Sequence, residues 1–239
     1  MRLNAFIAKA GFTSRRKAAE LIKDGKVKVG GKVVAEPWYV IKKGDAVTVS
    51  GKLLHAEESL YFIVNKAKGV TATVEDKHAL KKIVEMVSAD RARLYPIGRL
   101  DKDSRGLMIL TNDGDLCYRL THPKFEVEKE YVVAVKGTLD SDALARLKRG
   151  VFSEGDMLKV KTYSEVKKVA DRTMLHVIIA EGKKRHLRRL FKSLGHPVID
   201  LKRIRIGGLR LGQLAEGGFR KIGRDEIYSL TAVLRGTHA

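Results

Sequence analysis

The chain is organised around the stretch GRLDKDSRGL at residues 98–107, which is followed at once by MILTNDG at 108–114. An apolar segment, LYPI at 94–97, leads into it, and the apolar run after it ends in a turn signal. Its middle is short, polar and bracketed by glycines. This pattern predicts a loop held between two rigid strand-like segments, a place where reactive side chains often lie.

Asp101 is the residue of this loop with the most evident reactivity. Arg99 precedes it by two positions and Arg105 follows it by four, and nearby cations favour the ionised carboxylate. Such a carboxylate can act as a nucleophile or a base. The same pattern fits a solvated turn residue or a surface ion pair, which contributes little to stability. The loop alone leaves both interpretations open.

The full motif at 98–114 resembles the catalytic signature of the pseudouridine synthases that modify ribosomal RNA. That signature reads Gly-Arg-Leu-Asp-x-x-Ser/Thr-x-Gly-Leu and ends in Leu-Thr-Asn-Asp-Gly, and the match is unbroken. The resemblance implies that the family's catalytic aspartate falls on Asp101. It also implies that Arg99 fills the space left by a flipped base.

The composition indicates a polyanionic partner. Lys and Arg number 48 against 28 Asp and Glu, a net charge of +20, which favours nucleic acid first and an acidic membrane second. No apolar stretch approaches the roughly 20 residues of a membrane span, and the N-terminus lacks the hydrophobic region of a signal peptide. We therefore expect a cytoplasmic, soluble protein, with a monomer as the simplest state.

Metal and disulfide chemistry are disfavoured. Cys117 is the only cysteine, which excludes an internal disulfide and a cysteine-rich zinc site. Asp101 and Asp103 have the spacing of a metal-dependent phosphoryl-transfer or hydrolase site. However, Lys102 and Arg105 would repel a cation, and no further oxygen ligands lie nearby in sequence. Activity in excess chelator would exclude this rival class.

Residues 1–52 are expected to form a small domain of their own, with 12 basic and 4 acidic side chains. Apolar residues at helical spacing predict a helix at 3–10. A second helix is predicted to begin after Ser14 as its N-cap and to end at Gly25. Valines between residues 27 and 49, around a Gly-Gly turn, predict a small hairpin-based sheet.

The second of these helices carries a further resemblance. From Ser14 onward the pattern Ser-Arg-Arg-x-x-Ala-x-x-Leu-Ile-x-x-Gly-x-Val-x-Val-x-Gly is similar to the small RNA-binding module named after ribosomal protein S-four. Cations in a first helical turn oppose the helix dipole, which favours a functional role over a merely solvated face. The resemblance implies phosphate contacts that position the RNA. The expected contacts are Arg15, Arg16, Lys17 and Lys26.

Residues 53–59 are expected to be a linker and 60–239 a second, catalytic domain that opens with a buried strand. That strand ends in NKAKG at 65–69, which is similar to the family's first motif, Asn-Lys-Pro-x-Gly. Ala67 stands where the motif has proline, which would stiffen the turn. Lys66 is expected to contact RNA.

Apolar periodicity predicts further elements in this domain. Helices are expected at 79–87, 115–120 and 139–150, and strands at 128–135, 159–163 and 174–179. With the resemblance they indicate an α+β protein. Its small N-terminal helix-hairpin RNA-binding domain would precede a pseudouridine synthase domain with a mixed, mainly antiparallel sheet flanked by helices.

Tyr131 lies near the start of a predicted strand, where tyrosine is most often an ordinary core aromatic. The Lys-x-Tyr pattern at 129–131 resembles the family's second motif, whose tyrosine lies against the target base. Stacking on a base requires a flat π-face and tolerates a polar tip. The resemblance implies that Tyr131 stacks on the uracil and helps to remove its C5 proton.

The segment EGKKRHLRRLFK at 181–192 has six basic residues and an inward apolar face, a pattern also typical of a solvated amphipathic helix. It resembles the family's Glu-Gly-x-x-Arg-Gln-Ile-Arg-Arg motif, with His186 in place of Gln. The resemblance implies that Arg188 pairs with Asp101, keeping it charged and oriented. RNA contacts are expected at Lys184, Arg185 and Arg189.

The stretch 201–211 alternates apolar and basic residues, which predicts a strand with one face in the core and a cationic face towards RNA. It also resembles the family's C-terminal Leu-x-Arg-x-x-Ile-Gly segment. Arg203 is expected among the RNA contacts of this face.

These resemblances imply an rRNA pseudouridine synthase, closest to the large-subunit branch, whose partner is ribosomal RNA or a pre-ribosomal particle. The target uridine must be flipped out of the RNA, because stacking blocks chemistry at C1′ or C6. The reaction is an isomerisation, so no cofactor or metal is expected. Two alternatives remain: the same chemistry on small-subunit rRNA or tRNA, and a non-catalytic ribosome-assembly factor, against which Asp101, Tyr131 and Arg188 argue.

Overall fold

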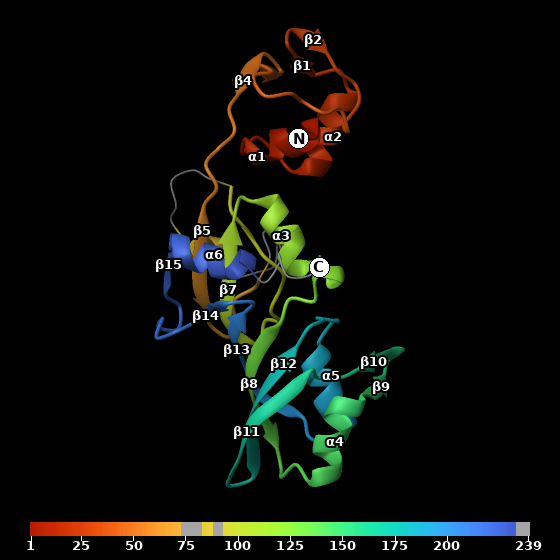
Figure 1. The fold of residues 1–239 in the computed structure, drawn as a ribbon, viewed down its shortest axis with the longest axis vertical. Helices are drawn as coiled ribbons and strands as arrows, with labels where there is room; N and C mark the ends of the chain where they lie inside the picture. The colour runs from red at the N-terminus through yellow and green to blue at the C-terminus, as the bar shows by residue number, and fades with distance from the viewer. Residues whose placement is uncertain (73–82, 88–92, 233–239) are drawn as a thin grey trace. The chain divides into compact units, whose positions relative to one another are not determined.

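The computed structural model describes residues 1–72, 83–87 and 93–232, which form two compact units (Figure 1). The first unit comprises residues 1–60 with two short later segments, and the second begins at Tyr61. In the described part of the chain, no helix has the length and apolar character needed to cross a membrane.

The first unit combines two helices with a small antiparallel sheet. The second helix begins as predicted, because the Ser14 hydroxyl accepts a hydrogen bond from the Lys17 backbone N–H at 3.3 Å. Valines of the sheet pack against the apolar faces of the helices. The elements are α1 (Leu3–Lys9), α2 (Arg15–Lys23), β1 (Val27–Val29), β2 (Lys32–Val33), β3 (Val47–Val49) and β4 (Lys52–Leu54). Strand β4 takes residues 53 and 54, which we expected in the linker.

The second unit is built on one large sheet with the strand order β11-β12-β8-β13-β7-β5-β15, which β14 and β6 extend through pairs with β13 and β7. Strand β13 runs parallel to β7 and antiparallel to β8, so the sheet is mixed and mainly antiparallel, as predicted. Its strands are β5 (Tyr61–Lys66), β6 (Tyr95–Pro96), β7 (Arg105–Thr111), β8 (Lys129–Lys136), β11 (Thr162–Val169), β12 (Arg172–Ile179), β13 (Val198–Ile206), β14 (Leu209–Arg210) and β15 (Phe219–Lys221).

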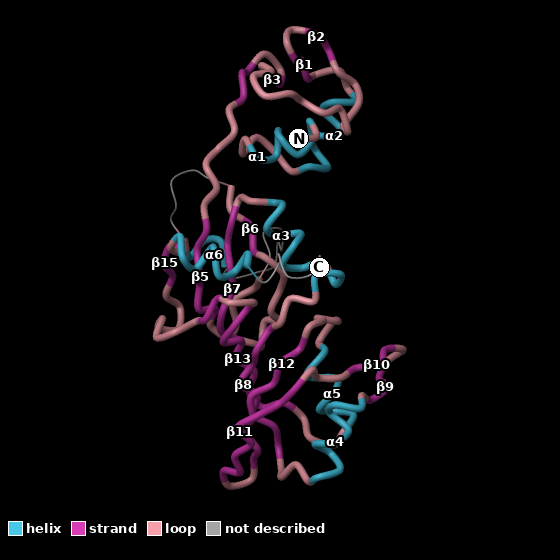
Figure 2. Tube along the Cα trace, in the orientation of Figure 1, coloured by secondary structure: helices cyan, strands magenta, loops and turns pink. Residues whose placement is uncertain are grey.

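Helices flank this sheet, with α4 and α5 gathered on one side of β12 and β8 (Figure 2). The helices are α3 (Gly114–Thr121), α4 (Ser141–Arg149), α5 (His186–Ser193) and α6 (Arg224–Ala232), with 3-10 turns η1 (Ile83–Met86) and η2 (Pro123–Phe125). Asp140 caps α4 through a 2.7 Å bond from the Ala143 N–H. Helix α5 buries Leu187, Leu190 and Phe191. The helix predicted at 79–87 lies largely outside the described residues.

Two predicted strands differ in extent from the observed ones. The strand expected at 159–163 is β11, which begins only at Thr162. The single strand expected at 201–211 is two, β13 and β14, joined by a Gly-Gly turn. A separate hairpin was missed: β9 (Val151–Ser153) pairs with β10 (Asp156–Leu158).

Candidate active site

The loop that carries Asp101 connects β6 to β7, as the motif predicted. Its residues turn back on themselves, because the Ser104 N–H donates to the Asp101 carbonyl at 3.0 Å. Ser104 is buried, whereas the Asp101 side chain is 33% exposed. The loop therefore presents its first carboxylate to solvent above a packed base.

Lys66, at the end of β5, forms that base. Its ammonium donates to the carbonyls of Ser104 at 2.6 Å and Lys102 at 3.4 Å, and Gly69 N–H also bonds to Lys102 O at 2.8 Å. The side chain is fully buried, and burial lowers the pKa of Lys66 to about 8. Lys66 was expected to contact RNA, but its side chain is buried in this structure. Its amine is spent on backbone carbonyls beneath the loop, so it acts as a positioning residue.

Two arginines at the start of α5 border the other side of the loop. Arg188 Nε lies 3.2 Å from the Asp103 carboxylate, and its terminal nitrogen donates to the Asp103 carbonyl at 3.0 Å. Arg185 reaches Asp103 at 3.3 Å and Asp101 at 3.9 Å. The expected Arg188–Asp101 pair is replaced in this structure by Arg188–Asp103. The guanidinium beside Asp101 belongs to Arg185.

Arg185 has an unusual backbone. Its φ is +51°, a left-handed conformation, immediately before α5 begins. Non-glycine residues in this region carry a conformational cost and gather at functional sites. Here the bend lets the side chain reach back to the loop rather than continue along the helix.

A cluster of ion pairs that was not predicted from the sequence surrounds Arg105, the first residue of β7. Arg105 donates to Asp200 on β13 with a shortest distance of 2.7 Å, and Lys68 lies 2.7 Å from the same carboxylate. Burial alone would raise the pKa of Asp200, but hydrogen bonds from Arg105 and Lys68 outweigh it and lower the pKa to about 2. The cluster ties the 65–69 turn, β7 and β13 together.

The register of β8, β13 and β7 places Tyr131 level with Gly106, which follows the Asp101 loop. Arg203 of β13 pairs with Tyr131 of β8 on one side and with Gly106 of β7 on the other. Gly106 has φ +106°, and a Cβ there would collide with the Arg203 backbone. Tyr131 is 7% exposed. Neighbouring strands lie about 4.8 Å apart, so Tyr131 lies roughly 10 Å across the sheet from Gly106.

The cationic face predicted for the C-terminal strand is not exposed at Arg203 or Arg205, because both side chains bond within the protein. Arg203 is 3% exposed, and its Nε donates to Leu107 O at 2.7 Å. Arg205 pairs with Glu130 at 2.8 Å and Glu128 at 3.1 Å. Both arginines are structural.

Arg189 was also expected to contact RNA and is instead bound to the β9–β10 hairpin. It lies 2.8 Å from Asp156 and 3.3 Å from Glu154, and it donates to the Ser153 carbonyl. Only 11% of its side chain is exposed, since these acceptors enclose the guanidinium. The remaining expected RNA contacts are exposed at the surface: Arg15, Arg16, Lys17, Lys26, Arg99, Lys184 and Arg185.

His186, the residue that replaces Gln in the motif, faces inward. Its Nε2 lies 2.9 Å from the Lys159 carbonyl, and burial lowers the pKa of the imidazole. His186 therefore bonds to the segment before β11 rather than to the Asp101 loop.

The chemistry available is that of a half-exposed anion beside a guanidinium, in a loop whose backbone is held from below by Lys66 and from the side by Arg188. Both carboxylates of the Asp-x-Asp pair face arginines. A divalent cation between them would meet these positive charges, so the arrangement suits anionic catalysis rather than metal binding.

Comparisons with known proteins point to one family. Residues 60–193 match the family model for RNA pseudouridylate synthase, and residues 1–47 match that for the S4 domain. The chain is 40% identical to ribosomal large subunit pseudouridine synthase B of Bacillus subtilis (strain 168), covering 97% of this chain and 96% of the relative. It is 36% identical to an uncharacterized RNA pseudouridine synthase of Aquifex aeolicus (strain VF5), covering 98% of each chain.

A solved structure gives the same result. The crystal structure of a pseudouridylate synthase superposes with a TM-score of 0.67 at 30% identity, covering 96% of this chain and 99% of that one. The sequence match and the shared fold both extend over nearly the whole chain. The chain therefore belongs to the RNA pseudouridylate synthase family, and it is an RNA isomerase that carries an N-terminal S4 RNA-binding domain.

Proposed function

We propose that this enzyme isomerises one uridine of large-subunit ribosomal RNA, with Asp101 as the nucleophile or the anion that assists glycosidic cleavage. The observation that carries the proposal is the Asp101 carboxylate, 33% exposed and 3.9 Å from Arg185, on a loop anchored by Lys66. The Bacillus subtilis relative named as a large-subunit enzyme supports the choice of RNA.

The reaction balances without a co-reactant. The N1–C1′ bond of the flipped uridine breaks, the base rotates, and a C5–C1′ bond forms; C5 loses a proton and N1 gains one. Tyr131 stacks on the uracil and assists loss of the C5 proton. Arg188 orients the loop through Asp103, and Arg185 completes the positive border beside Asp101.

RNA binding involves both units in this proposal. The exposed cations Arg15, Arg16, Lys17 and Lys26 grip phosphates in the S4 domain. Near the loop, Arg99 occupies the gap left by the flipped base, and Lys184 and Arg185 contact the backbone beside it. The substrate is either free ribosomal RNA or a pre-ribosomal particle.

The test uses RNA from a strain that lacks this protein, reacted with a carbodiimide that marks pseudouridine and mapped by primer extension. Wild type, Asp101→Asn and the exposed control Asp171→Asn are then added back, with and without excess chelator. We expect one large-subunit stop that returns with wild type and the control, but not with Asp101→Asn.

Other outcomes separate the alternatives. A stop in small-subunit rRNA or tRNA would change the substrate and keep the chemistry. Loss of activity in chelator would favour a metal site at Asp101 and Asp103. If neither wild type nor Asp101→Asn makes pseudouridine in any RNA, and both support normal ribosome assembly, the protein is a non-catalytic assembly factor.

A further inference from the structure

The β9–β10 hairpin exposes two large apolar side chains whose role the reaction does not explain. Phe152 and Met157 are 68% and 52% exposed, and they are direct cross-strand partners. Side chains opposite one another in an antiparallel pair lie on the same face and touch. They therefore form one apolar pad rather than two scattered contacts.

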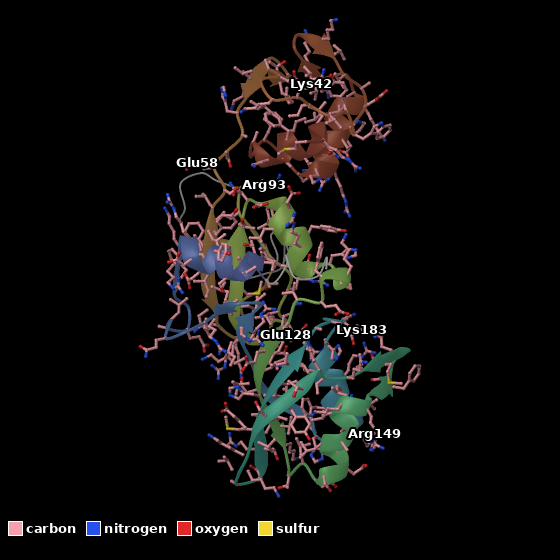
Figure 3. The ribbon with its side chains drawn as sticks, in the orientation of Figure 1. Lys42, Glu58, Arg93, Glu128, Arg149 and Lys183 are labelled. Carbon is pink, nitrogen blue, oxygen red and sulfur yellow. The ribbon has the colours of Figure 1, made fainter. Side chains whose placement is uncertain are left out.

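Hydrogen bonds and ion pairs from Arg189 and Lys183 hold the hairpin that carries the pad. Arg189 bonds to Asp156, Glu154 and the Ser153 carbonyl, which encloses the hairpin turn. Lys183, labelled in Figure 3, donates to the Met157 carbonyl at 2.9 Å. A pad fixed in advance loses little conformational freedom when a ligand covers it.

The start of α5 holds both the hairpin and the Asp101 loop. Arg188 and Arg189 are neighbours at the start of α5, and one bonds to the loop while the other bonds to the hairpin. Arg185, in the turn before the helix, lies beside Asp101. The loop and the hairpin are thus both bonded to the start of α5. A molecule that binds the hairpin is therefore held at a fixed position relative to Asp101.

The charges around the pad favour a polyanion that also carries flat apolar groups. The hairpin's carboxylates, Glu154 and Asp156, are both paired with Arg189 and so offer little free negative charge. Exposed cations lie at the end of α4, at Lys148 and Arg149, and just before α5, at Lys184. Unpaired RNA combines phosphates for such cations with base faces for an apolar pad.

We infer that Phe152 and Met157 stack on an unpaired base that flanks the target uridine. The inference rests on the proposed function, because flipping a nucleotide leaves its neighbours with an open face that needs a partner. The hairpin then selects RNA whose flanking base can unstack, and it contributes affinity and register rather than proton transfer.

The first test gives the pad its own fluorophore. Trp38 is the only tryptophan, so the full chain with Trp38→Phe and Phe152→Trp has a single indole at the pad. A matched reporter carries Trp38→Phe with Val169→Trp, at a 46% exposed position of β11. Each is titrated with a 23S rRNA transcript and with inorganic polyphosphate of equal charge, while binding is followed separately.

We expect base stacking to quench the hairpin indole with RNA but not with polyphosphate, and to leave the β11 indole unchanged. Equal quenching by both anions, or none with bound RNA, would overturn the inference. These results depend on binding alone, so they hold even if the protein makes no pseudouridine.

The second test measures turnover of RNA labelled with tritium at uridine C5. Phe152→Ala with Met157→Ala should lower kcat/KM roughly 5- to 150-fold, the range for losing one stacked base, with the urea midpoint unchanged. Val169→Ala should match wild type. An active wild type with an equally active double variant would refute the hairpin contact alone, whereas an inactive wild type would refute the proposed function.

Discussion

The cations of α2 lie exposed on the first unit, whereas those of the second unit's basic stretches are largely bonded to the protein itself. Arg15, Arg16 and Lys17 are exposed at the start of the helix. Lys66 and Arg203, in contrast, donate to backbone carbonyls inside the second unit. Similar basic patterns in the sequence thus produce two different structures, one suited to holding a polyanion and one that builds the active site.

Replacing an internal arginine should have the largest effect on stability. Arg203→Ala removes the side-chain donor to the Leu107 carbonyl and leaves a cavity where the buried side chain lay against Met108. We expect the free energy of unfolding to fall by about 3–5 kcal/mol in urea titrations. The exposed Arg210→Ala on β14 should change it by less than about 0.5 kcal/mol. Similar small effects at both positions would contradict the distinction between the two kinds of cation.

Lys66→Met tests the distinction at the loop. The substitution keeps the apolar stem but removes the ammonium that bonds to Ser104 O and Lys102 O. We expect kcat for pseudouridine formation to fall on the order of 100-fold, because a misplaced reactive group forfeits its orientation. The KM for RNA should change little. A raised KM with an unchanged kcat would mean that Lys66 binds RNA after all.

The pH dependence of stability sharpens the same point. Burial lowers the pKa of folded Lys66 from 10.5 to about 8, so the unfolded chain binds more protons between pH 8 and pH 10.5. The contribution of Lys66 to stability must therefore rise across that window. From pH 7.5 to 9.5, urea unfolding of wild type should gain about 1–2 kcal/mol relative to Lys66→Met. Lys129, whose pKa burial also lowers, is common to both proteins and cancels.

If the difference in unfolding free energy between wild type and Lys66→Met stays constant or falls over this pH range, the Lys66 ammonium is solvated rather than buried. Activity gives a second readout, because deprotonation removes one N–H donor and the positive charge near Asp101 and Asp103. The wild-type rate should thus fall above about pH 8, while the already impaired Lys66→Met variant should lack that step.

The smallest effect on stability should come from the α2 cations. Arg15→Ala with Arg16→Ala removes two charges that oppose the helix dipole, so stability should stay level or rise by a few tenths of a kcal/mol. RNA affinity should fall, and the slope of log K against log salt should become shallower by about 1.4–1.8. Lys167→Ala with Lys168→Ala, two exposed neighbours on β11, is the matched control for this slope. An unchanged slope would remove Arg15 and Arg16 from the interface.

Local signals predicted much of the fold. The Ser14 cap, the apolar face of α5 and the Asp101 loop before β7 each depend on residues within one or two turns of each other. Such patterns are readable in a single chain. Predicting these features did not require knowing which strands pair.

Partners far apart in sequence were not predictable in this way. Alternation in β13 was correctly read as a strand, but whether Arg203 faces solvent depends on β13 lying between β8 and β7. The loop's contacts with Lys66 and Arg188 span 38 and 85 residues. The β9–β10 hairpin did carry a signal, since Ser-Glu-Gly-Asp at 153–156 is turn-like between two short apolar pairs.

Gly106 gives the active site an evolutionary constraint. A single methyl group there would push β13 away from β7, and both Asp101 and Tyr131 are positioned from that pair of strands. One substitution would thus displace both of these proposed site residues at once. We expect this position to remain closed to every side chain, while the surrounding surface is free to drift and adapt to new RNAs.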